Sequence, residues 1–90
     1  IDIDDFSRVN STYGRLQGDD VLWAVAKVLQ RGLRSGDLIG RRTEDEFVVL
    51  LPDTPLHVAQ DVAERLRASV NDLRCARRDA SDETLSVTVT

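Results

Sequence analysis

Acidic side chains stand at two places where a strand is expected to end or to turn, and they are the first candidates for chemistry. Asp2 closes a strand-like start of the chain, and Asp45 and Glu46 lie at an expected hairpin tip. If the two strands pair, these carboxylates meet at one sheet edge. Mg²⁺ is usually held by one or two carboxylates together with substrate phosphates, and two such ions can stabilise both oxygens of a phosphoryl transfer. The alternative, ordinary solvated acids at strand ends, stays open on spacing alone.

Asn10 and Asp19 form a second pair with chemical potential. An amide and a carboxylate can together recognise the edge of a guanine, because the carboxylate accepts hydrogen bonds from its N–H groups. Asn10 ends one expected helix and Asp19 begins the next, so a purely structural role at helix ends is equally consistent with the sequence.

Two helical segments are expected in the first third of the chain. Residues 1–3 read as the end of a buried strand, and residues 4–13 as a short helix that Asp4 or Asp5 could cap. Gly14 is a break, and Gly18-Asp19 is expected to open a long helix. Its apolar residues recur at steps of three and four, which places them on one face. They are Leu22, Val25, Ala26, Leu29 and Leu33.

The rest of the chain predicts a hairpin, a third helix and a last strand. Residues 38–41 and 46–51 are the expected strands, the second of them buried, with 42–45 as the turn. Thr54-Pro55 is a typical helix start. Residues 74–83 read as a solvent loop, and 85–90 as a strand with one buried face. The apolar stripe of the third helix is Val58, Val62, Leu66, Val70 and Leu73.

This order of elements favours an α+β fold, an α/β sandwich with helices packed on a mostly antiparallel sheet. Ninety residues suit one domain with one small core. The chain opens on Ile1 and stops inside a strand-like run, so we expect a domain truncated at both ends and cut from a longer protein.

Composition narrows the function classes. The net charge of -4 argues against a nucleic-acid scaffold. The single cysteine, Cys75, excludes an internal disulfide and offers no metal spacing, as in a reducing cytoplasm. The longest apolar run, residues 21–26, is too short to cross a bilayer, so no membrane contact is expected from this segment.

Three motifs carry a resemblance to a known family. Residues 2–10 (DIDDFSRVN) resemble the D-x-D-x-F-K-x-I-N block of the bacterial GGDEF, or diguanylate cyclase, family. Residues 11–19 (STYGRLQGD) are similar to its D-x-[FY]-G-H-x-x-G-D block, and residues 41–47 (RRTEDEF) fall where the family has R-x-G-G-[DE]-E-F. Residues 48–54 and 63–67 also look like family sequence. The match covers nearly the whole chain with the expected spacing.

The resemblance implies a fold like the palm of nucleotide cyclases and polymerases. Active members of the family condense two GTP molecules into cyclic di-GMP across a dimer, one GTP per subunit. By position, Asp2 and Asp45 would bind Mg²⁺ with help from the Ile3 carbonyl, and Glu46 would be a further acid. Four more residues would contact the substrate. Asn10 and Asp19 would read guanine, while Phe6 and Ser7 would lie along the phosphates.

Several positions depart from the family pattern. Thr43 and Glu44 replace the Gly-Gly pair, and a β-branched Thr at positive φ is strongly disfavoured. Glu44 also adds bulk and charge, and like charges about 4 Å apart repel by roughly 4 kcal/mol at an effective dielectric of 20. Ser7 replaces a lysine, which Arg8 could partly substitute. Arg15 replaces the usual histidine. Efficient GTP turnover is therefore not expected.

A second family site is better preserved. Residues 34–37 (RSGD) resemble the RxxD inhibitory site, at the usual distance before the signature turn. Arg34 can bind guanine or phosphate bidentately, and Asp37 can accept from a guanine edge. Arg65 matches the second arginine of this site in some members. The alternative is a helix that ends in arginine, with Gly36 as its stop.

The sequence thus favours a degenerate GGDEF domain that binds cyclic di-GMP, or GTP weakly with Mg²⁺, and signals to an attached EAL or sensor domain. Two alternatives are an active diguanylate cyclase, which makes cyclic di-GMP and pyrophosphate, and a structural dimerisation domain beside an EAL phosphodiesterase domain. The expected location is the bacterial cytoplasm, and both a homodimer and a membrane-anchored parent chain are compatible with the resemblance.

Overall fold

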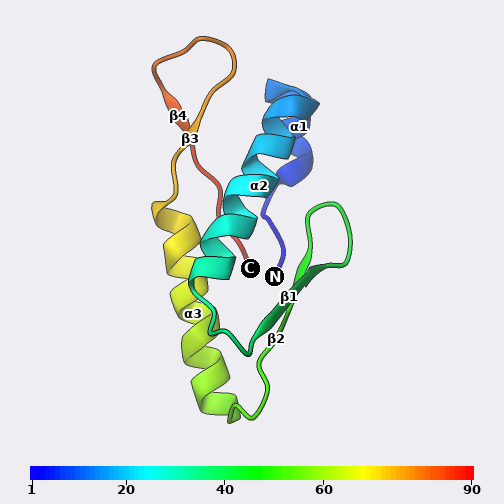
Figure 1. The fold of residues 1–90 in the computed structure, drawn as a ribbon. Coiled ribbons are helices and arrows are strands. Elements are labelled where there is room, and N and C mark those ends of the chain that lie inside the picture. Colours follow the sequence, from blue (N-terminus) through cyan, green and yellow to red (C-terminus); the bar gives the residue numbers. More distant parts are fainter.

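The computed structural model, which describes residues 1–90, consists of helices and short antiparallel strand pairs (Figure 1). The elements are α1 (Phe6–Tyr13), α2 (Arg15–Arg31), β1 (Leu38–Arg41), β2 (Phe47–Leu50), α3 (Leu56–Asp72), β3 (Cys75–Ala76) and β4 (Thr84–Leu85). The predicted α+β class is confirmed. No helix is long and apolar enough to span a membrane.

The N-terminal segment, residues 1–4, joins two parts of the sheet. β1 and β2 pair antiparallel, with Leu38 opposite Leu50. On the other side of β2, the amide of Phe47 donates to the Ile1 carbonyl over 2.7 Å, and the Ile1 amino group donates to the Phe47 carbonyl over 2.8 Å. Beyond the segment, Asp2 and Thr90 exchange backbone bonds of 2.8 and 2.9 Å. All neighbouring segments here are antiparallel, as expected.

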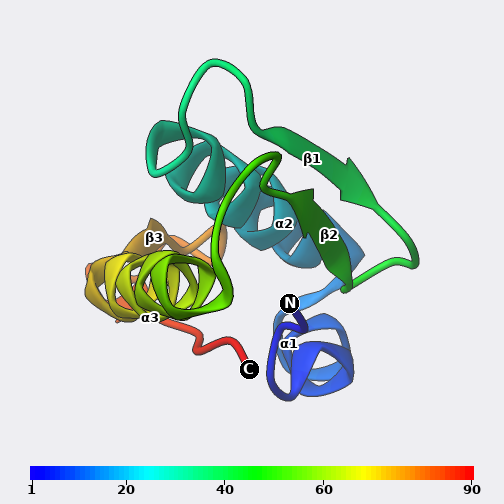
Figure 2. The ribbon, with the colours of Figure 1, turned by 90° about the horizontal axis from the view of Figure 1, so that it is seen from below.

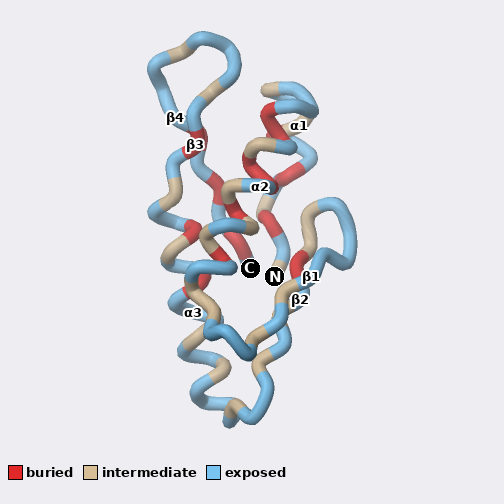
Figure 3. Tube along the Cα trace, in the orientation of Figure 1, coloured by how far each residue is buried: buried red, intermediate tan, exposed pale blue.

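The core lies between α2, α3 and the central segments of the sheet (Figures 2 and 3). The predicted stripe of α2 is confirmed, because Leu22, Val25 and Leu29 are buried. On α3, Leu66 and Val70 are buried, whereas Val58 at the start of the stripe is exposed. The last segment alternates as predicted. Its buried residues are Leu85, Val87 and Val89, and Ser86, Thr88 and Thr90 between and after them are exposed.

The helix starts differ from the sequence-based expectation. Neither Asp4 nor Asp5 caps α1. The Asp4 carboxylate instead accepts hydroxyl bonds from Thr88 at 2.6 Å and Thr90 at 2.8 Å, which lower the pKa of Asp4, Thr88 more than Thr90. α2 begins at Arg15 rather than Gly18, because the chain breaks at Gly14, whose φ of 92° an L side chain rarely adopts.

The expected cap of α3 is also wrong. Pro55 occupies the cap position with an extended backbone, and no side chain caps this helix. The Thr54 hydroxyl donates to the Pro52 carbonyl instead, over 2.9 Å, and accepts a bond from Arg34 over 2.7 Å. Thr54 therefore ties the β2–α3 connection to the α2–β1 connection.

The second strand is not buried as a whole. Phe47 is buried, but Val48 and Leu50 are exposed. Their register partners Gly40 and Leu38 are exposed too, so one face of the β1–β2 hairpin lies open. An apolar run does not distinguish a strand covered on both faces from one covered on one face.

Residues 74–83 are not a simple solvent loop. Cys75 and Ala76 pair with Leu85 and Thr84, and this β3–β4 hairpin rests on α2 through a buried glutamine. Gln17 donates from Nε2 to the Ala76 carbonyl over 3.1 Å and accepts at Oε1 from the Arg78 amide over 2.7 Å. A buried amide with both ends satisfied fixes the position of the segment it binds.

Candidate functional site

The strand pairing expected for the acidic residues is present. Asp2 and Glu46 are direct partners in an antiparallel bridge, and the Ile3 amide donates to the Asp45 carbonyl over 3.0 Å. The backbones of Asp2, Asp45 and Glu46 therefore lie next to one another at the start of β2.

The residues at this edge could supply only part of the coordination shell of a magnesium ion. No group of three or more His, Cys, Asp or Glu side chains is arranged to hold a metal ion. Mg²⁺ needs one or two carboxylates, with waters and phosphates completing the octahedron. The Ile3 carbonyl accepts no hydrogen bond although Ile3 is buried, so an oxygen ligand is free beside Asp2. Asp2, Asp45 and the Ile3 carbonyl would hold the ion, which would neutralise phosphate charge.

The turn that carries Asp45 is not strained in the expected way. Thr43 and Glu44 are absent from the residues with positive φ, so the strain that positive φ would cause in a β-branched threonine does not arise. The Thr43 hydroxyl lies 2.8 Å from the Glu46 carboxylate and 3.4 Å from that of Asp45. Its single proton serves one of them at a time. The side chain that was expected to disrupt the turn thus organises its acids.

Two departures from the family pattern contact each other. Arg15 Nη2 at the start of α2 lies 3.9 Å from Glu44 Oε1 at the hairpin tip, and the two side chains are 82% and 50% exposed. Such an exposed pair contributes at most about 1 kcal/mol. It nevertheless gives Arg15 a role that the sequence did not suggest, because it offsets part of the charge of Glu44.

The first turn of α1 offers free backbone donors. No side chain caps the helix, and the amides of Phe6 and Ser7 donate to no protein acceptor. Free N–H groups and the dipole make a helix N-terminus suited to phosphate. The Phe6 ring is buried in the core, so Phe6 would contribute its amide alone.

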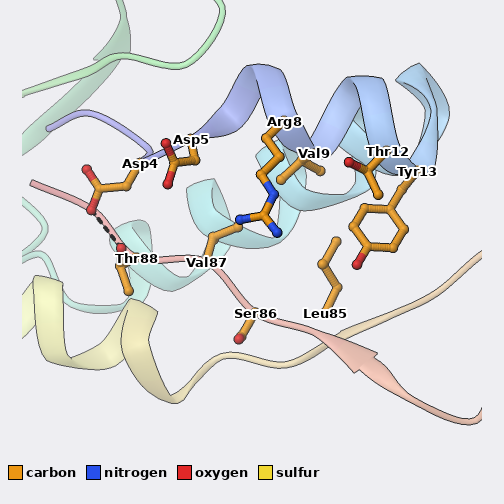
Figure 4. A pocket seen from close by; sticks show the side chains of 10 residues that line it. All are labelled: Asp4, Asp5, Arg8, Val9, Thr12, Tyr13, Leu85, Ser86, Val87 and Thr88. Atoms are coloured by element: carbon orange, nitrogen blue, oxygen red, sulfur yellow. Dashed lines mark hydrogen bonds between the residues drawn. The ribbon is translucent and has the colours of Figure 1, made fainter.

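Arg8 does not replace the lysine that is missing at Ser7. Its side chain enters a hollow of about 290 Å³ between α1 and residues 85–88, where Tyr13 and Thr88 also lie (Figure 4). The walls of this hollow include neither Asp2 nor Asp45. The Arg8 guanidinium therefore does not supply, near Asp2 and Asp45, the positive charge that is missing because Ser7 replaces the family's lysine.

The two expected guanine readers lie next to each other across the α1–α2 contact. Asn10 packs so closely on Gly18 that a Cβ there would lie 1.8 Å from Asn10 Oδ1, and Asp19 follows Gly18 directly. Asn10 Oδ1 is buried without a hydrogen-bond partner. Gly18 was not predicted as a site residue. The sequence signal for Gly18 is its place inside a helix, where glycine costs about 1 kcal/mol relative to alanine. A glycine at such a position indicates that another group approaches the backbone closely.

Trp23 on α2 lies outside the core. Its side chain is 67% exposed, with the Lys27 ammonium 5.2 Å from the ring centroid. Trp23 lines a hollow of about 280 Å³ together with Asp19, Arg41 and Phe47. This hollow separates α2 from the hairpin beside the expected guanine reader.

The residues of the second site gather where α2 ends. Arg34 donates to Asp37 from Nε over 3.2 Å and from Nη2 over 3.0 Å, and its amide donates over 2.8 Å. These bonds, the side-chain ones foremost, hold the pKa of Asp37 below its ordinary value, and the charge of Arg65 lowers it further. Arg65 reaches across from α3 and donates to the Gly32 carbonyl over 2.7 Å.

Comparisons with known proteins agree with these motifs. A family model described as "Diguanylate cyclase, GGDEF domain" matches residues 1–90. The diguanylate cyclase DgcM of Escherichia coli K12 is 49% identical over 70 residues, which cover 78% of this chain and 17% of DgcM.

Two solved structures are similar over 97% of this chain. Diguanylate cyclase SiaD of Pseudomonas aeruginosa, in complex with its activator SiaC, has a TM-score of 0.88, 44% identity and 32% of its chain covered. The GGDEF domain of DgcB from Caulobacter crescentus, in complex with c-di-GMP, has a TM-score of 0.88, 29% identity and 51% of its chain covered. The chain thus spans about half or less of each of these relatives.

Proposed function

This chain belongs to the GGDEF domain family, and from that premise we propose that it is a regulatory module of cyclic di-GMP signalling that binds cyclic di-GMP without efficient turnover of GTP. Cyclic di-GMP would bind through Arg34, Asp37 and Arg65. GTP would bind weakly at the hairpin tip, with Mg²⁺. In the cell the module would act in the cytoplasm on an attached EAL or sensor domain.

The observation that carries this proposal is the direct pair of Arg34 and Asp37 after the end of α2, with the charge of Arg65 nearby. Arg34 lies in the α2–β1 connection, and Arg65 reaches from α3 to the Gly32 carbonyl, so two positive charges act near the single carboxylate of Asp37. Paired arginines suit a ligand with two phosphates, and a carboxylate accepts from the guanine N–H edge. A hollow of about 390 Å³ beside Arg34 and Asp37 extends to Pro52 and Asp53.

The hairpin tip supports the second part of the proposal, that GTP binds weakly with Mg²⁺. The free amides of α1 and the Asp2–Asp45 edge are suited to a metal-bound triphosphate. Glu44 projects negative charge from the same tip, and Ser7 leaves a cation missing. A triphosphate would therefore meet repulsion that a glycine pair does not produce.

Arg34→Ala is expected to remove cyclic di-GMP binding. The substitution deletes the bidentate donor and leaves the Asp37 carboxylate without its main partner. Titration calorimetry with cyclic di-GMP should give measurable heat for the wild-type chain and a loss of at least about 100-fold in affinity for the variant, the usual scale for a charged bidentate contact. Arg74→Ala, an exposed arginine bonded only to neighbouring carbonyls, is the matched control. Equal binding by wild type and Arg34→Ala would contradict the proposal.

A second candidate function is diguanylate cyclase activity, and the unstrained turn favours it. Because Thr43 and Glu44 avoid positive φ, the tip does not need glycine to form. Incubation with GTP and Mg²⁺, read by chromatography, is expected to yield little cyclic di-GMP. Formation of product that disappears in Asp45→Ala would establish the cyclase and overturn the regulatory proposal.

If neither GTP nor cyclic di-GMP raises the melting temperature, a structural dimerisation role is favoured, since native-state ligands stabilise by mass action.

A further inference from the structure

The Asp37 carboxylate is almost fully enclosed by Arg34. Its side chain is 3% exposed, and it accepts three hydrogen bonds from that one residue, whose own side chain is 61% exposed. A carboxylate has about four lone-pair sites. A guanine edge cannot reach Asp37 in this arrangement unless the Arg34 guanidinium moves away first.

Thr54 holds the guanidinium in that closed position. Arg34 Nη2 donates both to Asp37 Oδ1 over 3.0 Å and to Thr54 Oγ1 over 2.7 Å. The Thr54 hydroxyl proton is used elsewhere, in the 2.9 Å bond to the Pro52 carbonyl. The oxygen lone pair of Thr54 is therefore oriented toward Arg34, and the guanidinium is held from two connections of the fold.

The segment that carries Thr54 is conformationally restricted. It is flanked by Pro52 and Pro55, and Asp53 between them has a φ of 51°. Proline fixes φ and reduces the freedom of its neighbours. Thr54 thus acts as a fixed acceptor, while the Nη1 group of Arg34 donates to no protein atom and remains available to an anion.

We propose that Thr54 is a positioning residue that keeps the Arg34–Asp37 pair closed and thereby weakens the site for cyclic di-GMP, a proposal that rests on the proposed function. A ligand can bind Asp37 only in the open state, so its apparent affinity falls with the fraction of open molecules. Removing the Thr54 acceptor raises that fraction.

Thr54→Val tests this, with Thr54→Ser as the matched control. Valine keeps the size and β-branching of threonine without its hydroxyl, and serine keeps the hydroxyl. No cap is lost, because Thr54 caps no helix. Calorimetry with cyclic di-GMP should show about three- to tenfold tighter binding for Thr54→Val, the range expected for one typical solvent-exposed hydrogen bond, and unchanged binding for Thr54→Ser.

A ligand-free readout separates this inference from the proposed function. The Arg34 Nε–H proton, which donates to Asp37, should exchange with water faster in Thr54→Val than in wild type by nuclear magnetic resonance. Unchanged exchange together with equal or weaker binding in Thr54→Val would overturn the role of Thr54. Absence of cyclic di-GMP binding in wild type and Thr54→Val alike would remove the proposed function, and the exchange rate would then still decide whether Thr54 closes the pair.

Discussion

Replacing Glu44 with glycine is expected to raise the affinity of the chain for GTP–Mg²⁺ by about 10- to 100-fold. Two like charges about 4 Å apart repel by roughly 4 kcal/mol at an effective dielectric of 20, and solvent and the Arg15 charge reduce that figure. The Glu44 side chain is half exposed, and its carboxylate lies 3.9 Å from Arg15 Nη2. We therefore expect about a third to two thirds of this repulsion between Glu44 and the triphosphate to remain, which corresponds to the stated change in affinity. Calorimetry with GTP and Mg²⁺ measures the change.

Two further variants separate charge from bulk at this position. Glu44→Gln keeps the size of the side chain and should recover most of the gain if charge is the cause. Arg15→Gln removes the partner and should weaken GTP binding, because the Glu44 charge is then fully uncompensated. If Glu44→Gly binds GTP no better than wild type, the charge at the hairpin tip is not what limits the site. Backbone strain at Thr43 or Glu44 does not explain weak GTP binding, because neither residue has a positive φ.

The parts of the fold that the sequence predicted are those with local periodic signals. The spacing of Leu22, Val25 and Leu29 defines one face of a helix whatever surrounds it, and these residues are buried. The alternation of Leu85, Val87 and Val89 similarly defines the buried face of the last segment. Local patterns report a period and a face directly.

The parts that the sequence did not predict depend on partners far along the chain. Asp4 has a good cap composition, but Thr88 and Thr90 compete for its carboxylate and are 84 and 86 residues away. The polar segment 74–83 forms a hairpin because Gln17, 59 residues before Ala76, satisfies its backbone. Propensity near the residue carries no information about such contacts.

The candidate site divides in the same way. Pairing of the two strands was enough to bring Asp2 and Glu46 together, and the backbone bridge confirms that placement. The sequence does not predict the pairing of Arg15 with Glu44, because the two residues lie far apart in the chain and no local pattern connects them. The Thr54-Pro55 pair predicts a helix start with Thr54 as its cap, whereas the Thr54 hydroxyl oxygen accepts a hydrogen bond from Arg34 instead. The metal, guanine and cyclic di-GMP roles of these residues stay predictions.

Leu29→Ala is expected to lower the free energy of unfolding by about 2–5 kcal/mol, the range measured when a fully buried leucine is truncated. Leu29 is 0% exposed on α2 and belongs to the core shared with α3. Small domains have a total stability of about 5–15 kcal/mol, so this change removes a large part of it. Urea denaturation followed by circular dichroism gives the value.

Leu16→Ala provides the matched control on the same helix. Leu16 is 64% exposed, and the chemical change is identical, so the loss should stay within about 0.5 kcal/mol. Alanine is also the best helix former, which offsets part of any lost packing. A similar loss in both variants would contradict the assignment of the loss to the buried contact of Leu29 with the core, because Leu16 makes no such contact. A loss confined to Leu29→Ala would show that the packing of α2 on α3 stabilises the fold. Both candidate sites then depend on this packing, because α2 begins at Arg15 beside the hairpin tip and ends at Arg31 beside Arg34 and Asp37.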